Sequence, residues 1–187
     1  MKIFLTTDTH FYHDKMPLYC DRPENHTELI GELLLTAGFT ENDVLIHLGD
    51  ICVGKDELAH ENYIKPLKCK KWLIRGNHDS KSNNWYLQHG WDWVGFMFQD
   101  RIFGKNILFS HTPILYVEQQ SGLWGTGSFD LNIHGHYHNT LHRLQEGKFL
   151  SDQEKQRNTE LANITSRHKL LAIEYTEYKP VLLEKFI

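Results

Sequence analysis

Five short polar motifs, each placed directly after a short apolar run, constrain how this chain can fold. In order they are Asp8-Thr9-His10, Gly49-Asp50, Gly76-Asn77-His78-Asp79, Ser110-His111 and Gly135-His136-Tyr137-His138. Their Asp, Asn and His side chains offer oxygen and imidazole donors, which suit divalent transition metals such as Mn, Fe, Ni or Zn. A fold that brings the five motifs together would have every ligand needed for two adjacent metal ions.

The segments between the motifs predict an α/β layered domain, because short apolar runs alternate with helical patterns. We expect strands at residues 2–6, 44–48, 72–74, 106–109, 131–133, 168–175 and 181–185. We expect helices between Asn25 and Gly38 and over residues 55–63 and 80–89. Residues 93–98 and 101–103 look like a hairpin that turns near Gln99-Asp100, and the polar segment 145–162 looks like an excursion without regular structure.

The motifs lie where this fold class builds its sites. In layered α/β domains the carboxyl ends of the strands form the site, since the chain leaves the sheet there and side chains can converge. Asp8 and His10 are two residues apart, as are His136 and His138, so each pair can project to the same side of an extended segment. Glycines precede ligand residues at positions 49, 76 and 135, where the backbone must turn sharply or approach the metals closely.

Length and composition indicate one domain spanning residues 1–187. The chain has 187 residues, 40% of them apolar, which suffices for one well-packed core. No apolar run is as long as a membrane span, and residues 1–4 enter an expected strand without the features of a signal peptide. We therefore expect a cytoplasmic protein with no membrane partner.

Charge favours small substrates over long nucleic acids. The formal net charge is −4, whereas binding to long nucleic acids depends on many Lys and Arg contacts with phosphates. Four lysines cluster at positions 65, 68, 70 and 71, and we interpret them as a solvated face that leads into a strand. The expected partner is a small phosphorylated or nucleotide substrate.

The motif set resembles that of the calcineurin-like metallophosphoesterase superfamily, whose signature runs D-x-H, G-D, G-N-H-[DE], H and G-H-x-H. Every element is present in order between Asp8 and His138, about three quarters of the chain. The resemblance implies a layered αββα sandwich of two mixed β-sheets flanked by helices. It allows a homodimer, since dimers are common in that superfamily.

Carried over position by position, the resemblance implies two divalent metal ions, with manganese first and Fe, Ni or Zn as alternatives. One ion would be held by Asp8, His10, Asp50 and His138. The other would be held by Asp50, Asn77, His111 and His136, with Asp50 bridging the two ions.

The resemblance also implies a reaction, the hydrolysis of a phosphate ester by attack of a metal-bridging hydroxide. His78 would assist the leaving group, with Asp79 or another carboxylate available to orient it. Further substrate contacts are expected from Asn77, from His13 in the loop of the first motif, and from Tyr137, which adjoins two ligands and could stack on a nucleobase.

Comparison with two branches of this superfamily bears on which substrate to expect. Ser/Thr protein phosphatases extend the second motif to G-D-x-V-D-R-G, whereas here it continues as residues 51–55, Ile-Cys-Val-Gly-Lys, without the phosphate-gripping arginine. Arg75 or Lys55 could partly substitute. The stretch Tyr19-Cys20-Asp21-Arg22-Pro23 is similar to one in small bacterial and phage phosphoesterases, most of which are uncharacterised.

Three functions stay open at this point: a phosphodiesterase for a small or nucleotide-like diester, a phosphomonoesterase, and a non-catalytic metal-binding scaffold. His78 beside a full ligand set argues against the scaffold, because a docking face needs no group to assist a leaving alkoxide. Few arginines lie near the motifs, which favours a monoanionic diester over a dianionic monoester.

Overall fold

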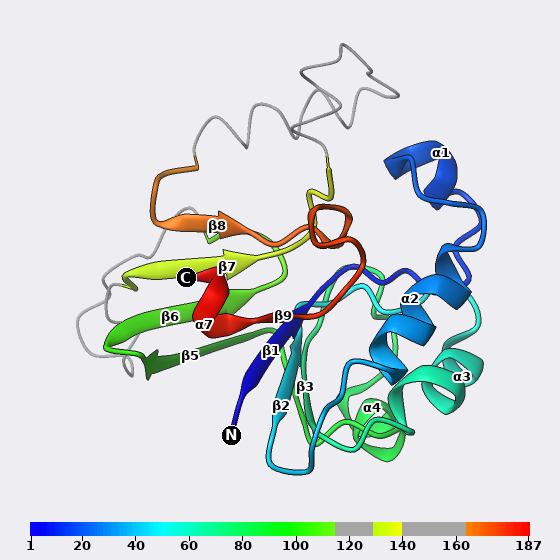
Figure 1. Ribbon diagram of the computed structural model, residues 1–187, viewed down its shortest axis with the longest axis horizontal. Coiled ribbons are helices and arrows are strands. Elements are labelled where there is room, and N and C mark those ends of the chain that lie inside the picture. Colours follow the sequence, from blue (N-terminus) through cyan, green and yellow to red (C-terminus); the bar gives the residue numbers. More distant parts are fainter. Residues whose placement is uncertain (115–128, 140–163) are drawn as a thin grey trace.

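The computed structural model describes residues 1–114, 129–139 and 164–187, which form two β-sheets and several helices (Figure 1). One sheet has five strands in the order β4-β3-β2-β1-β9, and the other has four in the order β5-β6-β7-β8. The expected fold class, two mixed sheets with flanking helices, is confirmed. The expected excursion at 145–162 lies outside the described residues.

The five-stranded sheet has a parallel core of four strands. These are β1 (Ile3–Thr6), β2 (Val44–His47), β3 (Lys70–Ile74) and β4 (Trp93–Gly95), with β9 (Val181–Leu182) antiparallel to β1 at the edge. All four residues of β2 are buried, as expected for a central parallel strand that is covered on both faces.

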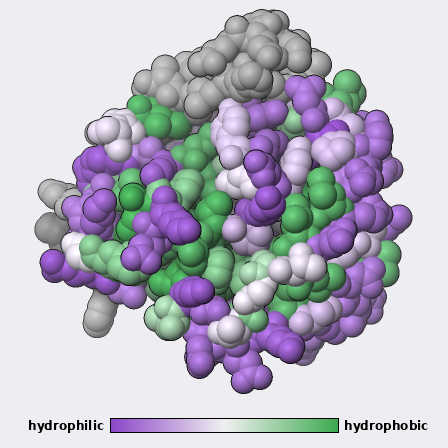
Figure 2. Space-filling view, viewed as in Figure 1, coloured by the Kyte–Doolittle hydropathy of each residue, from purple (hydrophilic) through white to green (hydrophobic). Residues whose placement is uncertain are grey.

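The four-stranded sheet joins an antiparallel hairpin to two parallel strands. β5 (Met97–Ile102) is antiparallel to β6 (Lys105–Ser110), whereas β7 (Leu131–His134) and β8 (His168–Leu170) follow in parallel. Apolar side chains from both sheets, including Leu5, Ile46, Phe109 and Ile133, form one buried cluster between them. On the face shown in Figure 2, hydrophobic residues come to the surface in the middle of the molecule, with hydrophilic residues around them.

Helices cover the other face of the five-stranded sheet (Figure 1). They are α2 (His26–Leu35), α3 (Asp56–Ala59), the π-helix η1 (His60–Ile64) and α4 (Asn83–Gln88), whereas α1 (Met16–Cys20) lies beyond α2, away from the strands. Ile30 and Leu34 of α2 pack with Ile64, Leu45 and Leu73 in a second buried cluster. The three expected helices are present, although α4 is shorter than the predicted 80–89. In the described part of the chain, no helix is long and apolar enough to cross a membrane.

The predicted hairpin over 93–103 is wrong in its pairing. Residues 93–95 belong to the other sheet, where β4 pairs with β3, and Gln99 and Asp100 lie inside β5 opposite Leu108 and Ile107. The chain turns instead at Phe103-Gly104, because both residues have positive φ (51° and 80°), which matches the twist of a two-residue hairpin loop.

The two closing strands are shorter than predicted. β8 ends at Leu170 and is followed by the 3-10 helix η2 (Ile173–Thr176), so the expected strand over 168–175 is wrong beyond its first residues. Likewise β9 stops at Leu182, and α7 (Leu183–Phe186) takes up the rest of the expected 181–185 strand.

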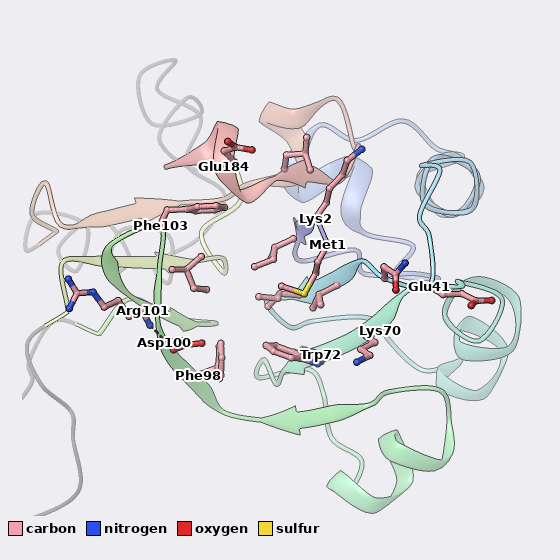
Figure 3. A pocket seen from close by; sticks show the side chains of 16 residues that line it. Met1, Lys2, Glu41, Lys70, Trp72, Phe98, Asp100, Arg101, Phe103 and Glu184 are labelled. Carbon is pink, nitrogen blue, oxygen red and sulfur yellow. Dashed lines mark hydrogen bonds between the residues drawn. The ribbon is translucent and has the colours of Figure 1, made fainter.

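A cavity of about 850 Å³ opens between the sheets, at the amino-terminal ends of β1, β2 and β3 and beside β5 (Figure 3). Ile3, Val44, Trp72 and Phe98 line it, and Phe103 adds a ring from the β5–β6 turn. The five polar motifs follow the opposite ends of their strands, so this cavity is separate from the site described next.

Candidate metal centre

The seven predicted metal ligands all lie just beyond strand ends. Asp8 and His10 follow β1, Asp50 follows β2, and Asn77 follows β3. From the second sheet, His111 follows β6, and His136 and His138 follow β7. Because β1, β2 and β3 are parallel neighbours, and β6 and β7 are parallel neighbours in the other sheet, each sheet delivers its ligands at one edge.

Asp8, His10 and His138 form a first group able to hold a cation. Oδ1 of Asp8 lies 3.8 Å from Nε2 of His10 and 3.7 Å from Nε2 of His138. These separations are too long for hydrogen bonds, and Oδ1 is buried with no hydrogen-bond partner among the residues that the structure describes. A buried carboxylate oxygen facing two imidazole nitrogens at this spacing fits a divalent metal with O and N ligands.

Asp50, His111 and His136 form a second such group. Nε2 of His111 lies 3.3 Å from Oδ2 of Asp50, 3.1 Å from Nδ1 of His136 and 3.0 Å from Oδ1 of Asn77. The same Oδ2 of Asp50 is 3.6 Å from Nε2 of His10 in the first group. Asp50 therefore lies between the two groups.

The backbone around these ligands is unusual. Asp8, His10, Asp50, His136 and His138 all have positive φ, between 45° and 74°, which non-glycine residues rarely adopt and which clusters at functional sites. The strained segments support one another through backbone hydrogen bonds. The N–H of Asp8 donates to the backbone carbonyl of Gly49 (2.8 Å), and the N–H of His10 donates to the backbone carbonyl of Asp50 (3.0 Å).

Two of the motif glycines are explained by close approach. A Cβ on Gly76 would lie 2.1 Å from Oδ1 of Asp50, and a Cβ on Gly135 would lie 2.4 Å from Oδ2 of Asp8. Any larger residue would push a ligand carboxylate out of position.

Asp79 braces the ligand loops. Its carboxylate accepts hydrogen bonds from the backbone N–H groups of Gly76 (2.7 Å), Asp50 (2.8 Å) and Ile51 (3.0 Å). Burial raises the pKa of Asp79 above its usual value even though these donors act in the other direction. Since both oxygens face backbone amides, the structure places Asp79 behind the metal loops rather than as a partner that orients the His78 ring.

His78 and His13 lie beside His10 of the first group. His78 is exposed, its N–H donates to Oδ1 of Asp50 (2.8 Å), and its ring centroid is 5.1 Å from that of His10. The ring of His13 is 5.6 Å from that of His10 and 6.2 Å from that of His78. The structure therefore brings these two predicted residues together.

The side chains of Arg75 and Tyr137, both predicted to contact substrate, are engaged with other residues of the protein. Arg75 donates to the carbonyl of Asp79 (2.6 Å) and to Oδ1 of Asn83 (3.0 Å), so its guanidinium anchors the loop after β3. Tyr137 is only 2% exposed, and its ring packs 5.2 Å from that of His136.

The charges of the site favour cations. Burial lowers the pKa of His111, but the hydrogen bond to Asp50 and the charges of Asp8 and Asp50 outweigh it and raise that pKa to about 9. His10 has the opposite balance: burial, followed by the positive charges of His138 and Arg22, lowers its pKa well below the usual value. Carboxylates that attract a proton this strongly would attract a metal ion in its place.

Sequence analysis missed two residues at the site, Arg22 and Glu174. Arg22 belongs to the Tyr-Cys-Asp-Arg-Pro stretch, so a signal existed, but no role was assigned to it. Glu174 lies in η2, inside a segment predicted to be a strand, and nothing in the sequence marked it. The guanidinium of Arg22 donates to Oε1 of Glu174 (2.7 Å), which also lies 3.1 Å from Nδ1 of His138.

Cys20, His138 and Glu174 form a third group with the spacing of metal ligands. The guanidinium of Arg22 already contacts two of its members, Glu174 at 2.7 Å and Nδ1 of His138 at 3.3 Å. A permanent positive charge at that point disfavours a metal cation, so this group is a supporting layer behind the first group.

The chain is similar to several known proteins along much of its length. An uncharacterized protein of Methanocaldococcus jannaschii is 25% identical over 195 residues, which span 100% of this chain and 89% of the relative. The crystal structure of a protein of unknown function from Aquifex aeolicus covers 98% of this chain and 96% of that chain, with a TM-score of 0.66 and 22% identity, and supports the fold. An archaeal phosphodiesterase structure covers 73% of each chain at a TM-score of 0.41 and 18% identity.

A family model also matches nearly the whole chain. The model of the calcineurin-like phosphoesterase family matches residues 1–185, which include every motif and both groups of candidate metal ligands. This chain therefore belongs to the calcineurin-like phosphoesterase family.

Proposed function

We propose that this protein is a dinuclear metal-dependent phosphodiesterase that hydrolyses a small or nucleotide-like diester. The observation that carries the proposal is the pair of ligand groups with Asp50 between them. Its Oδ2 lies 3.3 Å from Nε2 of His111 and 3.6 Å from Nε2 of His10. The family of the chain supports phosphate-ester hydrolysis as the reaction class.

The donor set fits two divalent ions. Asp8, His10, Asp50 and His138 would hold one, and Asp50, Asn77, His111 and His136 would hold the other, with manganese the first candidate and Fe, Ni or Zn the alternatives. When bound, such a pair of ions lowers the pKa of a water molecule and neutralises the charge that develops on the phosphate.

His78 is proposed to donate a proton to the leaving oxygen. Its backbone is held by the hydrogen bond to Asp50, whereas its ring is exposed beside the ligand groups. A histidine ring at this position can act as a general acid toward the leaving oxygen. A face used only for docking would have no need of this group, which argues against the scaffold alternative.

The arginines that adjoin the site favour a diester. Monoester sites commonly surround the terminal dianion with cations. Here the side chain of Arg22 is fully buried against Glu174, and Arg75 is turned toward Asp79 and Asn83. His13, beside His78, is proposed as a substrate contact that suits a single negative charge.

The test is metal-dependent hydrolysis by protein stripped of metal and resupplied with Mn²⁺. We expect faster cleavage of bis-p-nitrophenyl phosphate than of p-nitrophenyl phosphate. Preference for the monoester would replace the proposal with a phosphomonoesterase. Absence of metal-dependent turnover of either ester and of a dinucleotide would contradict it.

The role of His78 is tested with two leaving groups. Nitrophenolate is a weak base that leaves readily without a proton, whereas a ribose alkoxide needs one. His78→Ala should therefore lower kcat by roughly 10²–10⁴-fold on a dinucleotide and by much less on bis-p-nitrophenyl phosphate. His89→Ala, a histidine of the helical face, is the matched control. Equal losses on both substrates would remove the proton-donor role.

A further inference from the structure

A buried ion pair lies directly behind the first ligand group. Oε1 of Glu174 accepts hydrogen bonds from Nε (2.9 Å) and Nη2 (2.7 Å) of Arg22. The Arg22 side chain is 0% exposed and that of Glu174 is 5% exposed. Burying two charges costs free energy, and such a pair is often no more stabilising than apolar residues of the same size, so its position at the site calls for another explanation.

Glu174 sets the direction of one ligand imidazole. Nδ1 of His138 lies 3.1 Å from Oε1 of Glu174, and Nε2 of the same ring faces Oδ1 of Asp8 at 3.7 Å. A carboxylate can only accept a hydrogen bond, and although Nη2 of Arg22 lies 3.3 Å from the same Nδ1, its two hydrogens go to Glu174 and to the carbonyl of Asp8, both at 2.7 Å. Nδ1 therefore carries the hydrogen in the neutral ring. Nε2 then presents its lone pair to the first ligand group, as a metal ligand must.

Arg22 supports the other side of the same group. Its Nη2 donates to the carbonyl of Asp8 (2.7 Å) and its Nη1 donates to the carbonyl of Thr9 (3.0 Å). These carbonyls belong to the turn in which Asp8 and His10 have positive φ (46° and 45°). One guanidinium therefore holds a strained turn that carries two ligands and, through Glu174, a third ligand from the other sheet.

The second ligand group is supported in a different way. Nδ1 of His111 lies 2.7 Å from the backbone carbonyl of Leu48, so a neutral carbonyl takes the place that Glu174 takes behind His138. The loops of Asp50 and Asn77 are braced by Asp79 instead. Of the two ligand groups, the contacts that the structure describes for Arg22 and Glu174 thus go to the first.

We propose that Arg22 and Glu174 are positioning residues for one of the two metal ions, that held by Asp8, His10 and His138. The inference rests on the proposed function, because it assumes that this group holds a cation. It assigns a role to the arginine of the Tyr-Cys-Asp-Arg-Pro stretch. It also makes the two metal sites unequal, since among the described residues only one of them has a buried carboxylate from outside the motifs behind it.

The experiment is a calorimetric Mn²⁺ titration of the full-length, metal-free protein and of two variants. Glu174→Gln keeps the size of the side chain and removes its charge. Glu177→Gln makes the same change three residues away at an exposed position, where the glutamate pairs with Lys179. We expect Glu174→Gln to weaken one Mn²⁺ site by 10–100-fold and to leave the other unchanged, whereas Glu177→Gln should match the wild type.

Two results would overturn the inference: unchanged binding at both sites in Glu174→Gln, or an equal loss at both sites, which would indicate general destabilisation. Failure of the proposed function looks different, because a wild type that binds two ions but cleaves no ester leaves the roles of Arg22 and Glu174 in place. A wild type that binds no ion would overturn both.

A second measurement needs no substitution at Glu174. Imidazole ¹H–¹⁵N correlation spectra of the Zn²⁺-loaded wild type report which ring nitrogen carries hydrogen, and the signals of His138 are those lost in His138→Asn. We expect hydrogen on Nδ1 of His138. Hydrogen on Nε2 would overturn the inference even if Glu174→Gln did not fold.

Discussion

Asp79 connects two loops that carry metal ligands, and it does so with a single carboxylate. The three N–H groups that it accepts from belong to Gly76, in the loop after β3, and to Asp50 and Ile51, in the loop after β2. The side chain is 3% exposed, so water cannot replace these hydrogen bonds. Asp79 thus resembles an internal cap whose removal would leave several buried donors without an acceptor.

We therefore predict that Asp79→Asn lowers the free energy of unfolding by about 2–4 kcal/mol. Asparagine keeps one acceptor oxygen, but its NH₂ group would face an N–H donor where the second carboxylate oxygen now lies. Urea unfolding of metal-free protein measures the effect. Asp100→Asn, on the exposed part of β5, is the control, and equal stability of the two variants would contradict the role assigned to Asp79.

Among the elements, the β5–β6 hairpin depends on its two turn residues. Ile102 pairs with Lys105, which leaves Phe103 and Gly104 as a two-residue loop in which both residues have positive φ. A Cβ on Gly104 would meet no atom within 4 Å, so only backbone strain would oppose a larger residue. The hairpin in turn forms one edge of the four-stranded sheet.

We predict that Gly104→Ala lowers the free energy of unfolding by about 1 kcal/mol, whereas Gly104→Asn costs less, since asparagine tolerates the left-handed region. Thermal or urea unfolding of the two variants side by side would measure the difference. If alanine were tolerated as well as asparagine, the turn would have to adopt another conformation.

The elements also indicate what could be predicted from the sequence. The runs that became β1, β2, β3, β6 and β7 are apolar and end in motifs, so both their type and the position of the ligands beyond them were predictable. β8 has three residues and β9 has two, which are too few for a periodic pattern. The sequence therefore predicts longer strands, which extend into the helices that follow β8 and β9. The hairpin was misplaced because Phe103 is an uncommon residue for a left-handed turn.

The support of the first ligand group could not be predicted in the same way. Arg22 and Glu174 are 152 residues apart and meet only because η2 follows the last strand of the second sheet. Each residue alone has no distinctive spacing. The candidate metal ligands could be predicted because their type and order are local, whereas the contacts behind them depend on tertiary packing.

For the molecule as a whole, the two ligand groups predict that stability depends on metal. An ion that binds the folded state and not the unfolded state stabilises the fold by about 2.7 kcal/mol when its free concentration is 100 times its Kd. We predict that chelation lowers the thermal midpoint and that Mn²⁺ restores it. His78→Ala should keep this gain, because His78 is not among the candidate ligands, and Asp50→Asn should lose most of it. A thermal unfolding midpoint that is the same with and without Mn²⁺ would contradict the proposed metal centre.

Acid sensitivity is a second property of the whole molecule, because several histidines that are not candidate metal ligands are buried. His60 lies among the rings of Trp85, Tyr86 and Trp91, and its Nε2 has no hydrogen-bond partner in the described part of the chain. Burial lowers the pKa of His60 to about 4, from 6.5 in an exposed imidazole. Burial likewise lowers the pKa of His134 to about 4 and that of His47 to about 3.

Acid destabilises the fold because protons bind to these histidines more readily in the unfolded chain than in the folded chain. Between pH 6.5 and pH 4 the unfolded chain protonates these histidines and the folded chain does not, so the stability of the fold falls as the pH falls. The contribution of His60 is complete above pH 6.5 and is lost by about pH 4. A pKa difference of this size corresponds to about 3 kcal/mol for one residue.

We predict that His60→Gln, which cannot take up a proton, reduces the loss of stability of metal-free protein between pH 7 and pH 4.5. His89→Gln, a partly exposed histidine of the same aromatic cluster, should leave that loss close to the wild-type value. Urea unfolding at the two pH values gives the difference for each protein. If His60→Gln lost as much stability as the wild type, the proton taken up on acid unfolding would have to bind elsewhere, and the burial of His60 would not account for the acid sensitivity of the fold.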